Sequence, residues 1–361
     1  MSNEYLGRIT NIREHGKTIF LDIENTDRKI QAIIKKEKFK PKVRAGDFIY
    51  IQGHIGKSKI GQESIIAESY HLLNRPKKYI GTSKELRELL VKRHELEQII
   101  RNVFLEEGFI QTDSRELLRY AGTSNIVPFK TKSIDGKELF LRFTMELELK
   151  RLICNTPLPL FEIGHLFRNM GISNRRTHEF KVLEAYAPYR NLSYGVSLIK
   201  KIMKQVTEKF GIKDETIKEF EMSDLFEKFK SQDKNPEETY SSEIKRSEKP
   251  VIVKYQFSHQ ASPLSKKHNN ETVEDVKLFW RGMGTIIHIN EEAGDYEDIK
   301  KKFNMQLKNL SGKRKDKSID KDFLKDFANG MPPCLGIYIS LDRMLAAIMN
   351  KSSINEVIHL R

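Results

Sequence analysis

The feature that most constrains the fold of this chain is the segment of residues 161–189, FEIGHLFRNMGISNRRTHEFKVLEAYAPY. It contains two runs of strand length, FEIGHLF and KVLEAYAPY, on either side of a loop. In the second run, Leu183 and Ala185 alternate with Glu184 and Tyr186, and this period of two is typical of a β-strand. The segment therefore predicts a pair of strands joined by a short loop.

The loop is rich in arginine and is followed by an aromatic residue. Arg175 and Arg176 lie in the loop, Arg168 follows the first run, and Phe180 directly precedes the second. Guanidinium groups match the geometry of phosphate oxygens, and an aromatic ring can cover a base. The segment can therefore hold a nucleotide. A hairpin with a basic, solvated loop is the alternative that this pattern leaves open.

The segment closely resembles motif 2 of class II aminoacyl-tRNA synthetases, in the form found in lysyl-tRNA synthetases. The shared letters are FEIG, FRN, GIS, EF and the E-x-Y that follows. Two other segments fit the same family: FLRFTMELELKRL before motif 2, and a C-terminal run with DFL, GMPP and LDRM that resembles motif 3. The resemblance implies an α+β catalytic domain, in which a mostly antiparallel sheet is flanked by helices.

The resemblance also implies roles for particular residues. ATP would be bound by Arg168, Arg175, Arg176, Phe180 and Arg343, of which Arg168 and Arg343 are the expected catalytic residues; the amino acid would be bound by Glu146, Glu184 and Tyr186; and Mg²⁺ would be bound by Glu291. A buried carboxylate beside a phenol suits an ammonium group, although the alternation also allows an outward Glu and Tyr. An ionised amino-acid carboxylate can attack the α-phosphate without a general base, so positioning and electrostatics would do most of the work.

Residues 1–74 are expected to form a separate β domain. Five runs of strand length, separated by turn residues, suggest an OB-fold barrel. The stretch resembles the anticodon-binding domain of lysyl-, aspartyl- and asparaginyl-tRNA synthetases through GRI, REHGK, F-L-D-I and K-I-Q. In that family Phe20 would stack on an anticodon base and Gln31 would bond to one. A place for Phe20 in the barrel core is the alternative.

The rest of the chain divides into a linker and one large domain. The linker covers residues 75–83 and the catalytic domain residues 84–361. An apolar stripe after Thr82 and Glu85 predicts a helix that ends at Gly108. A polar, charged stretch at about 212–250 is expected to be a helical insertion with an exposed loop. Its charged residues, like those of 311–321, are expected to be solvated surface.

Several positions depart from the family pattern. The departures are Arg115 in place of a motif 1 proline, Met170 in place of a glutamate near adenine, Gly284 in place of a metal-binding acid, and Tyr338 and Ser340 in place of motif 3 glycines. Side chains replace hydrogen at two places where backbone would lie close to substrate. Tyr338 is expected to project near the amino acid or the ATP.

Composition is consistent with a nucleic-acid partner. The 361 residues carry a formal net charge of +14, which favours a polyanion. The two cysteines, Cys154 and Cys334, give neither a disulfide framework nor a zinc site, so a reducing cytoplasm is expected. No apolar run approaches membrane-span length, and the N-terminus has no apolar signal core, so neither a membrane association nor export is expected.

The resemblance implies ATP-dependent activation of an amino acid, lysine or a related one, and its transfer to tRNA by a homodimer. The departures leave two alternatives. One is a paralogue that activates a different amino acid or uses an acceptor other than tRNA. The other is a non-catalytic, tRNA-binding regulatory protein.

Overall fold

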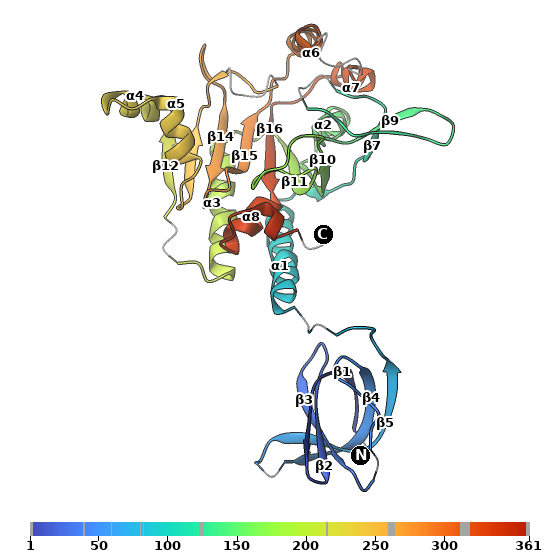
Figure 1. Cartoon of the computed structure of the whole chain (residues 1–361). Helices are drawn as coiled ribbons and strands as arrows, with labels where there is room; N and C mark the ends of the chain where they lie inside the picture. Colours follow the sequence, from blue (N-terminus) through green and yellow to red (C-terminus); the bar gives the residue numbers. More distant parts are fainter. Residues whose placement is uncertain are drawn as a thin grey trace. The chain divides into compact units, whose positions relative to one another are not determined.

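The structure is a computed structural model that describes residues 3–38, 40–58, 60–79, 81, 83–122, 126–213, 216–258, 264–310 and 318–358. The backbone separates into two compact units, Met1–Glu85 and Leu86–Arg361. Figure 1 shows that each unit has β-sheet of its own, and each unit also has its own apolar core. The expected order of a β domain followed by an α+β domain is confirmed.

The first unit is a closed five-stranded barrel. Its strands are β1 (Asn3–His15), β2 (Thr18–Glu24), β3 (Lys29–Lys35), β4 (Phe48–Lys57) and β5 (Glu63–Asn74), and they close in the order β1-β2-β3-β5-β4. Ile19, Leu21 and Ile23 of β2 point into the barrel core. Phe20 lies between them in sequence and is absent from that core, so the alternative that placed it there is wrong.

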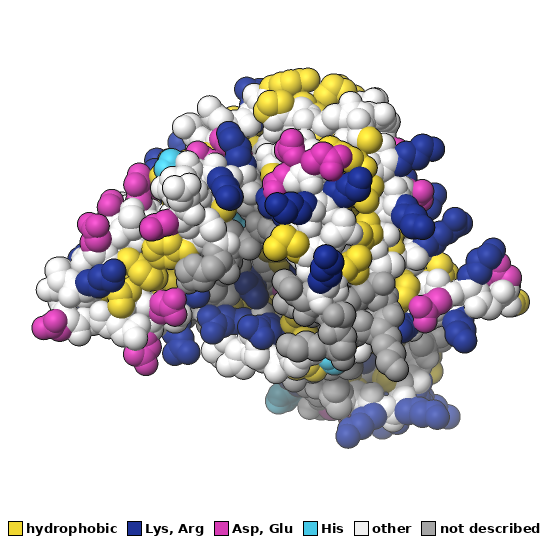
Figure 2. All heavy atoms as spheres, turned by 90° about the horizontal axis from the view of Figure 1, so that it is seen from above, with side chains coloured by type: hydrophobic (Ala, Val, Ile, Leu, Met, Phe, Trp, Pro, Cys, Tyr) yellow, Lys and Arg dark blue, Asp and Glu magenta, His cyan; other side chains and the backbone are white. Residues whose placement is uncertain are grey.

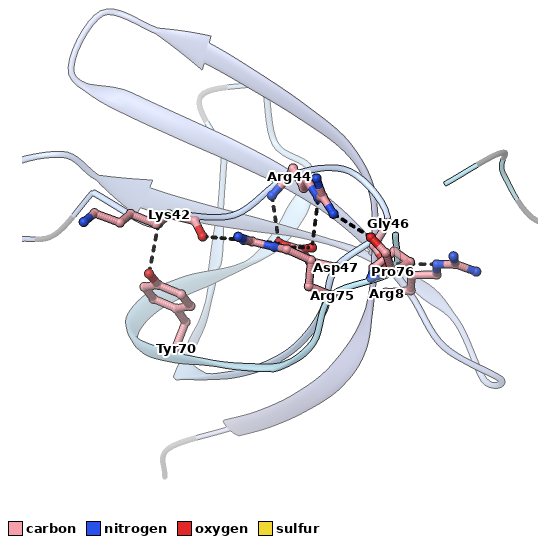
Figure 3. A network of polar contacts seen from close by, with 8 residues as sticks. All are labelled: Arg8, Lys42, Arg44, Gly46, Asp47, Tyr70, Arg75 and Pro76. Atoms are coloured by element: carbon pink, nitrogen blue, oxygen red, sulfur yellow. Dashed lines mark hydrogen bonds and ion pairs between the residues drawn. The ribbon is translucent and has the colours of Figure 1, made fainter. Parts of the chain in front are cut away.

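A buried carboxylate joins the barrel to the segment that follows it. Asp47 accepts hydrogen bonds from Arg75 Nε at 3.0 Å and from the backbone N–H of Arg44 at 2.9 Å, as Figure 3 shows. Burial alone would raise the pKa of Asp47, but the bonds from Arg75 and Arg44 outweigh it and hold the pKa below its ordinary value. This network fixes the start of the connection at Arg75 and Pro76 against the barrel.

The second unit is built on a mixed, mainly antiparallel sheet of eight strands in the order β12-β13-β14-β15-β16-β11-β10-β6. The strands are β6 (Ile110–Gln111), β10 (Leu160–Phe167), β11 (Glu179–Pro188), β12 (Lys218–Glu221), β13 (Val251–Lys254), β14 (Asp275–Phe279), β15 (Thr285–Glu291) and β16 (Cys334–Ser340). A second sheet pairs β7 (Leu117–Leu118), β9 (Glu138–Leu141) and β8 (Lys130–Lys132). The antiparallel β10–β11 pair is the strand pair that residues 161–189 predicted.

Helices pack on both faces of the large sheet. One face packs against α1 (Lys84–Glu106), α3 (Leu192–Lys209) and α8 (Leu341–Ile348), through strand residues such as Leu183 and Ile339. The opposite face packs against α2 (Glu146–Asn155), α6 (Tyr296–Leu310) and α7 (Lys321–Phe327), through residues such as Val182 and Tyr186. Alternation along β11 therefore assigns Glu184 and Tyr186 to the face of α2.

The predicted first helix is confirmed as α1, and Gly108 follows it with a φ of +82°. Thr82, expected at its cap, lies outside the described residues. Leu89, Leu96 and Ile100 of the expected apolar stripe are buried, whereas Leu90 remains exposed. In the described residues no helix is long and apolar enough to cross a membrane.

The stretch at about 212–250 contains more regular secondary structure than the expected helical insertion with an exposed loop. It contains β12, α4 (Met222–Ser231), α5 (Pro236–Thr239) and the π-helix η1 (Tyr240–Ile244). Its apolar residues, including Phe229, Tyr240 and Ile244, pack with Val253 and Phe279 of the sheet. The helices were expected, but the edge strand and this small core were not. The last helix among the described residues is the 3-10 helix η3 (Ile354–Glu356).

Candidate active site

The expected nucleotide-binding residues lie around one cavity of about 340 Å³. The lining residues come from the loop between β10 and β11, from β16 and from the start of α8: they include Arg168, Met170, Arg175, Arg176, Phe180, Tyr338, Ser340 and Arg343. Five residues predicted from separate motifs are therefore brought together by the fold. In Figure 2, Lys and Arg side chains gather around the recess in the middle of the view.

The arginines of the cavity are held by backbone carbonyls. Arg168 donates from Nε to the carbonyl of Phe143 at 3.2 Å, and its guanidinium lies 5.1 Å from the centre of the Phe180 ring. Arg343 donates to the carbonyls of Thr285 and Arg175, each at 2.9 Å. Neutral acceptors orient these side chains and leave their positive charge uncompensated.

Burial lowers the pKa of Arg343, and nearby guanidinium groups, among them that of Arg175, act in the same direction. A guanidinium remains protonated despite such a shift, because its ordinary pKa lies far above neutral pH. The arginines of the cavity are therefore positively charged, while Asp342, which also lines it, is paired with Arg93. A polyanionic ligand would relieve the repulsion between its arginines.

Two contacts at α8 fix the position of Arg343. Ser340 caps the helix by accepting a hydrogen bond from the Arg343 N–H at 3.4 Å. The buried Asp342 pairs with Arg93 of α1 at 2.8 Å and accepts from the backbone N–H of Lys181 at 2.7 Å. Asp342 thus joins three elements beside the cavity, and Ser340 replaces the expected glycine with a helix-capping residue.

The expected amino-acid-binding residues lie next to this cavity rather than in its lining. Glu184 is directly opposite Tyr338 in the β11–β16 ladder, and Tyr186 is opposite Gly336. Both Glu184 and Tyr186 are buried, at 6% and 5% exposure, so the alternative with both side chains outward is wrong. Glu146, at the start of α2, packs on the same face.

Glu184 is a buried carboxylate without an ion pair in the described part of the chain. Its Oε2 accepts from the Met145 N–H at 3.1 Å, with a longer contact to Thr144 Oγ1 at 3.5 Å. Burial raises the pKa of Glu184 to about 7, and the charge of Glu146 adds to the shift, while Arg168 opposes it. Such a group gains from a cationic ligand.

A lysine of the chain already occupies part of this region. Lys150, fully enclosed on α2, donates from Nζ to Glu146 Oε1 and to Glu292 Oε2, each at 2.7 Å, and lies 5.5 Å from the centre of the Tyr186 ring. Burial alone would lower the pKa of Lys150, but its two carboxylate partners outweigh that effect and raise it. Glu146 and Glu292 therefore already share an ammonium group, whereas Glu184 does not.

Tyr338 projects into the site, as expected for a side chain that replaces a glycine. It lines the nucleotide cavity, and its neighbours across the sheet are Glu184 and His288. Burial raises the pKa of its phenol. Met170 also lines the cavity. The phenol of Tyr338 thus lies at the boundary between the nucleotide cavity and the buried carboxylates.

The structure places Glu291 away from these residues. Its neighbour Glu292 reaches Lys150, and successive side chains of a strand point to opposite faces. Glu291 accepts from the Leu192 N–H at 3.0 Å and from Lys266 Nζ at 2.8 Å, so both of its oxygens are engaged. Glu291, for which the resemblance implied a metal-binding role, is thus paired with Lys266 and with the backbone at the start of α3.

The residues that are present do not fit a protein-held magnesium ion. Magnesium prefers several oxygen ligands in octahedral geometry. Gly284 offers no side-chain ligand, and Glu291 is paired with Lys266. Across the described ranges, no group of three or more His, Cys, Asp or Glu side chains could hold a metal ion. We therefore derive no step through a metal bound to the protein.

The OB unit has a cavity of its own, of about 490 Å³, on the surface of β2 and β3. Phe20 and Gln31, the two expected anticodon-binding residues, both line it. Around them are the cations and polar groups of Arg13, His15, Lys35, Lys57 and Gln62. Gln31 is buried and accepts from Ser64 Oγ at 3.2 Å, which fixes its amide. An aromatic ring among cations suits single-stranded nucleic acid.

Sequence reasoning missed several residues of the catalytic region. The missed residues are Lys150 and Glu292, and also Lys245 and Arg246, which line a second cavity that shares Arg175, Arg176 and Arg343 with the first. Only Lys150 had a usable signal, because it stands four residues after Glu146 on a predicted helix, where the two side chains meet. The other three are brought to the site by contacts between distant segments.

Comparisons with known families agree with this geometry. The family described as tRNA synthetases class II (D, K and N) matches residues 70–360. A second family, described as OB-fold nucleic acid binding domain, matches residues 6–73. The second match covers the barrel with the cavity of Phe20 and Gln31, and the first covers the sheet unit with the cavity of Arg168 and Arg343.

Individual relatives are similar over nearly the whole chain. Lysine--tRNA ligase 2 of Methanosarcina acetivorans is 28% identical, with 98% of this chain and 83% of that protein aligned. Lysine--tRNA ligase of Buchnera aphidicola subsp. Cinara cedri is 29% identical, with 98% and 84% aligned. The family match spans most of the residues, and the chain therefore belongs to the class II tRNA synthetases of the D, K and N group.

Proposed function

We propose that the protein uses ATP to activate lysine, or an amino acid related to it, and transfers the aminoacyl group to tRNA. The observation that carries this proposal is the single cavity that holds Arg168, Phe180 and Arg343 beside the buried carboxylate of Glu184. The cavity offers cations to a triphosphate, and Glu184 offers an anion to an ammonium group. The relatives that are named lysine--tRNA ligases support the same assignment.

The proposed chemistry follows from charge. The amino-acid carboxylate attacks the α-phosphorus and forms a mixed anhydride, the bond to the bridging oxygen breaks, and its electron pair leaves with pyrophosphate. The carboxylate is already ionised at neutral pH, so no base is needed. Arg168 would stabilise the charge on the α-phosphate, while adenine would lie between Phe180 and Arg343. Magnesium would enter with the phosphates of ATP.

ATP–pyrophosphate exchange tests this proposal. The purified protein should catalyse exchange with lysine. Arg168→Ala and Arg343→Ala should each lower kcat/KM by about 100-fold or more, because each substitution removes a positive charge that stabilises the transition state. Arg190→Ala is the matched control, because Arg190 lies beyond the far end of β11 from Phe180. Exchange that survives in either cavity variant would refute the assignment.

The barrel is the proposed site for the tRNA anticodon. The support is the cavity on β2 and β3, where Phe20 and Gln31 lie among basic residues. Phe20→Ala should raise the Kd for tRNA by about 5- to 100-fold, since base stacking contributes about 1–3 kcal/mol, and should leave exchange unchanged. Phe48→Ala is the matched control, because Phe48 lies outside this cavity. Equal losses in both variants would contradict the role of Phe20.

One observation favours a second candidate, activation of an amino acid other than lysine. Lys150 already bridges Glu146 and Glu292, and Tyr338 adds bulk next to Glu184. Both features reduce the space and the negative charge available to a substrate ammonium. Exchange measured against all twenty amino acids would separate the candidates, since lysine alone would support the first.

We also infer a cytoplasmic homodimer. Apolar side chains remain exposed on α1, at Leu90 and Leu105, and on the edge strand β6, at Ile110. A second copy would cover them. The expected interface also contains Arg115, whose side chain is exposed. Sedimentation should give twice the chain mass of 42.2 kDa, and a monomer at micromolar concentration would contradict the dimer.

A further inference from the structure

A second cavity, of about 510 Å³, adjoins the nucleotide cavity. We call it the basic cavity, and its lining residues are Ser173, Arg175, Arg176, Ser241, Lys245, Arg246, Gly284 and Arg343. Three of its arginines, Arg175, Arg176 and Arg343, also line the nucleotide cavity. The two spaces are therefore contiguous, and among the described residues no acidic side chain lines the second.

The basic cavity brings five cations together, and among the described residues the charge of Glu237 acts on one of them, Lys245. Within the described ranges, no ion pair joins Arg175, Arg176, Lys245 or Arg246 to an acidic side chain, and Arg343 bonds only to carbonyls. Burial lowers the pKa of Lys245, the charge of Arg175 adds to this effect, and the charge of Glu237 opposes it. Unpaired cations gathered at one place are typical of a phosphate-binding site.

Lys245 and Arg246 are held by the small core of residues 222–253. Tyr240 and Ile244 of η1 are buried in that core, and the two cations follow them directly. The carbonyl of Ser247 accepts from the Gly282 N–H at 3.2 Å, which ties this segment to the turn before β15. The segment therefore presents its cations at a defined place.

Gly284 lies at the point where these groups converge. A Cβ atom there would stand 3.6 Å from Arg175 and 3.7 Å from Arg343, and the φ of +74° suits glycine. The family resemblance places a metal-binding acid at this position. An acid would pair with the two arginines, whereas glycine leaves them free for an incoming anion.

We propose that the basic cavity binds the β- and γ-phosphates of ATP and the pyrophosphate that they become, and that Lys245 and Arg246 supply there the charge that a protein-held metal ion would otherwise supply. The inference rests on the proposed function and deepens it. When the bond between the α-phosphorus and the bridging oxygen breaks, pyrophosphate takes the electron pair. The two cations lie where that negative charge would increase, so they would stabilise the leaving group.

Titration with inorganic pyrophosphate, followed by calorimetry in EDTA, tests the inference directly. The wild-type protein should bind pyrophosphate without metal. Lys245→Ala and Arg246→Ala should each weaken binding by about 10-fold, because each removes a charge-assisted bond. Affinity for AMP, which has neither phosphate, should not change. Lys249→Ala is the matched control, because Lys249 belongs to the same segment and does not line the cavity.

Three results would overturn the inference: unchanged pyrophosphate affinity in the double variant, an equal loss for AMP, or wild-type binding that requires magnesium. Lys245→Arg and Arg246→Lys should retain most of the affinity, which excludes a general loss of folding. The titration does not depend on activity. If the wild-type protein catalyses exchange and Lys245→Ala and Arg246→Ala both bind pyrophosphate normally, the inference is rejected and the proposed function is not. If the wild-type protein catalyses no exchange but binds pyrophosphate as expected, the proposed function is rejected and the inference is not.

Discussion

At the scale of single residues, the site is defined by how its buried carboxylates are neutralised. Glu146 and Glu292 share the ammonium of Lys150. Glu184 has hydrogen bonds but no ion pair among the described residues, and burial raises its pKa to about 7. An unpaired buried carboxylate is costly to the folded state, so a functional reason for keeping it is expected. A substrate ammonium would provide that reason.

This predicts a pH-dependent KM for the amino acid. Glu184 can pair with an ammonium only when it is ionised, so KM in the exchange assay should rise by up to about 10-fold as pH falls from 7 to 6. Burial also raises the pKa of Glu292, so both carboxylates contribute to the pH dependence of KM and a variant must separate them. Glu184→Gln should raise KM and remove the Glu184 contribution to the profile. An unchanged profile in that variant would contradict the role of Glu184.

Glu184→Gln should weaken amino-acid binding, but it should increase the stability of the folded protein at high pH. A pKa raised in the folded state means that the folded protein binds the proton more tightly than the unfolded chain. Stability from Glu184 is therefore present below pH about 4.5 and is lost as pH rises to about 7. Glu184→Gln should stabilise the protein by up to about 3 kcal/mol at pH 8 and by little at pH 4.5, as denaturant unfolding would measure.

At the scale of elements, β16 shows how tightly the sheet and the site are coupled. Its partners are β11 on one side and β15 on the other, and its side chains face Glu184, Tyr186 and His288 across the ladders. Gly336 is the only glycine of β16 itself that faces this region. A Cβ atom at Gly336 would collide with the Glu292 carboxylate and would also crowd the Tyr186 ring.

Gly336→Ala should therefore destabilise the second unit. The substitution would displace Glu292 from Lys150 and leave part of a buried ion pair unsatisfied, at a cost of about 1–3 kcal/mol. Gly171→Ala is the control, because its added Cβ would meet no atom within 4 Å. Chemical denaturation of both variants would measure the difference, and equal stability would show that Glu292 can move without penalty.

At the scale of the whole molecule, the two units have independent apolar cores. The buried residues of the barrel core lie between Tyr5 and Ala67. Its connection to the following segment is stabilised by Asp47, whose pKa is held below its ordinary value by the hydrogen bonds from Arg75 and Arg44, against the effect of burial. A lowered pKa means stability that is present above pH about 4 and lost as pH falls through the folded value.

Asp47→Asn should therefore destabilise the barrel alone. The amide loses the charge-assisted bonds from Arg75, which is partly exposed, so a cost of about 2 kcal/mol is expected. Hydrogen exchange should quicken for the amides of β1 to β5 at pH 7, with those of β10, β11 and β16 unchanged. Asp27→Asn, a substitution in an exposed turn, is the control. A loss of protection in both units would show that their stabilities are coupled.

The sequence by itself determined several of the elements and the expected residues of the cavity that contains Arg168 and Arg343. Local periodicity is enough to predict α1 and the β10–β11 pair, because a helix or strand forms one apolar face at a fixed spacing. Motif letters were enough to select Arg168, Phe180 and Arg343, and the fold brings them together. Periodicity and motif letters both depend on residues that are close together in the chain, so they can be read from the sequence alone.

Only the tertiary structure decided which charges meet. Because strand side chains alternate, a shift of one position moves a carboxylate to the other face, and Glu292 rather than Glu291 reaches the site. Lys245 belongs to a charged stretch that was expected to be solvated surface, yet the core around Tyr240 brings it to the basic cavity. The physical reason is that ion pairing and burial depend on contacts between segments far apart in the chain, and no local pattern records them.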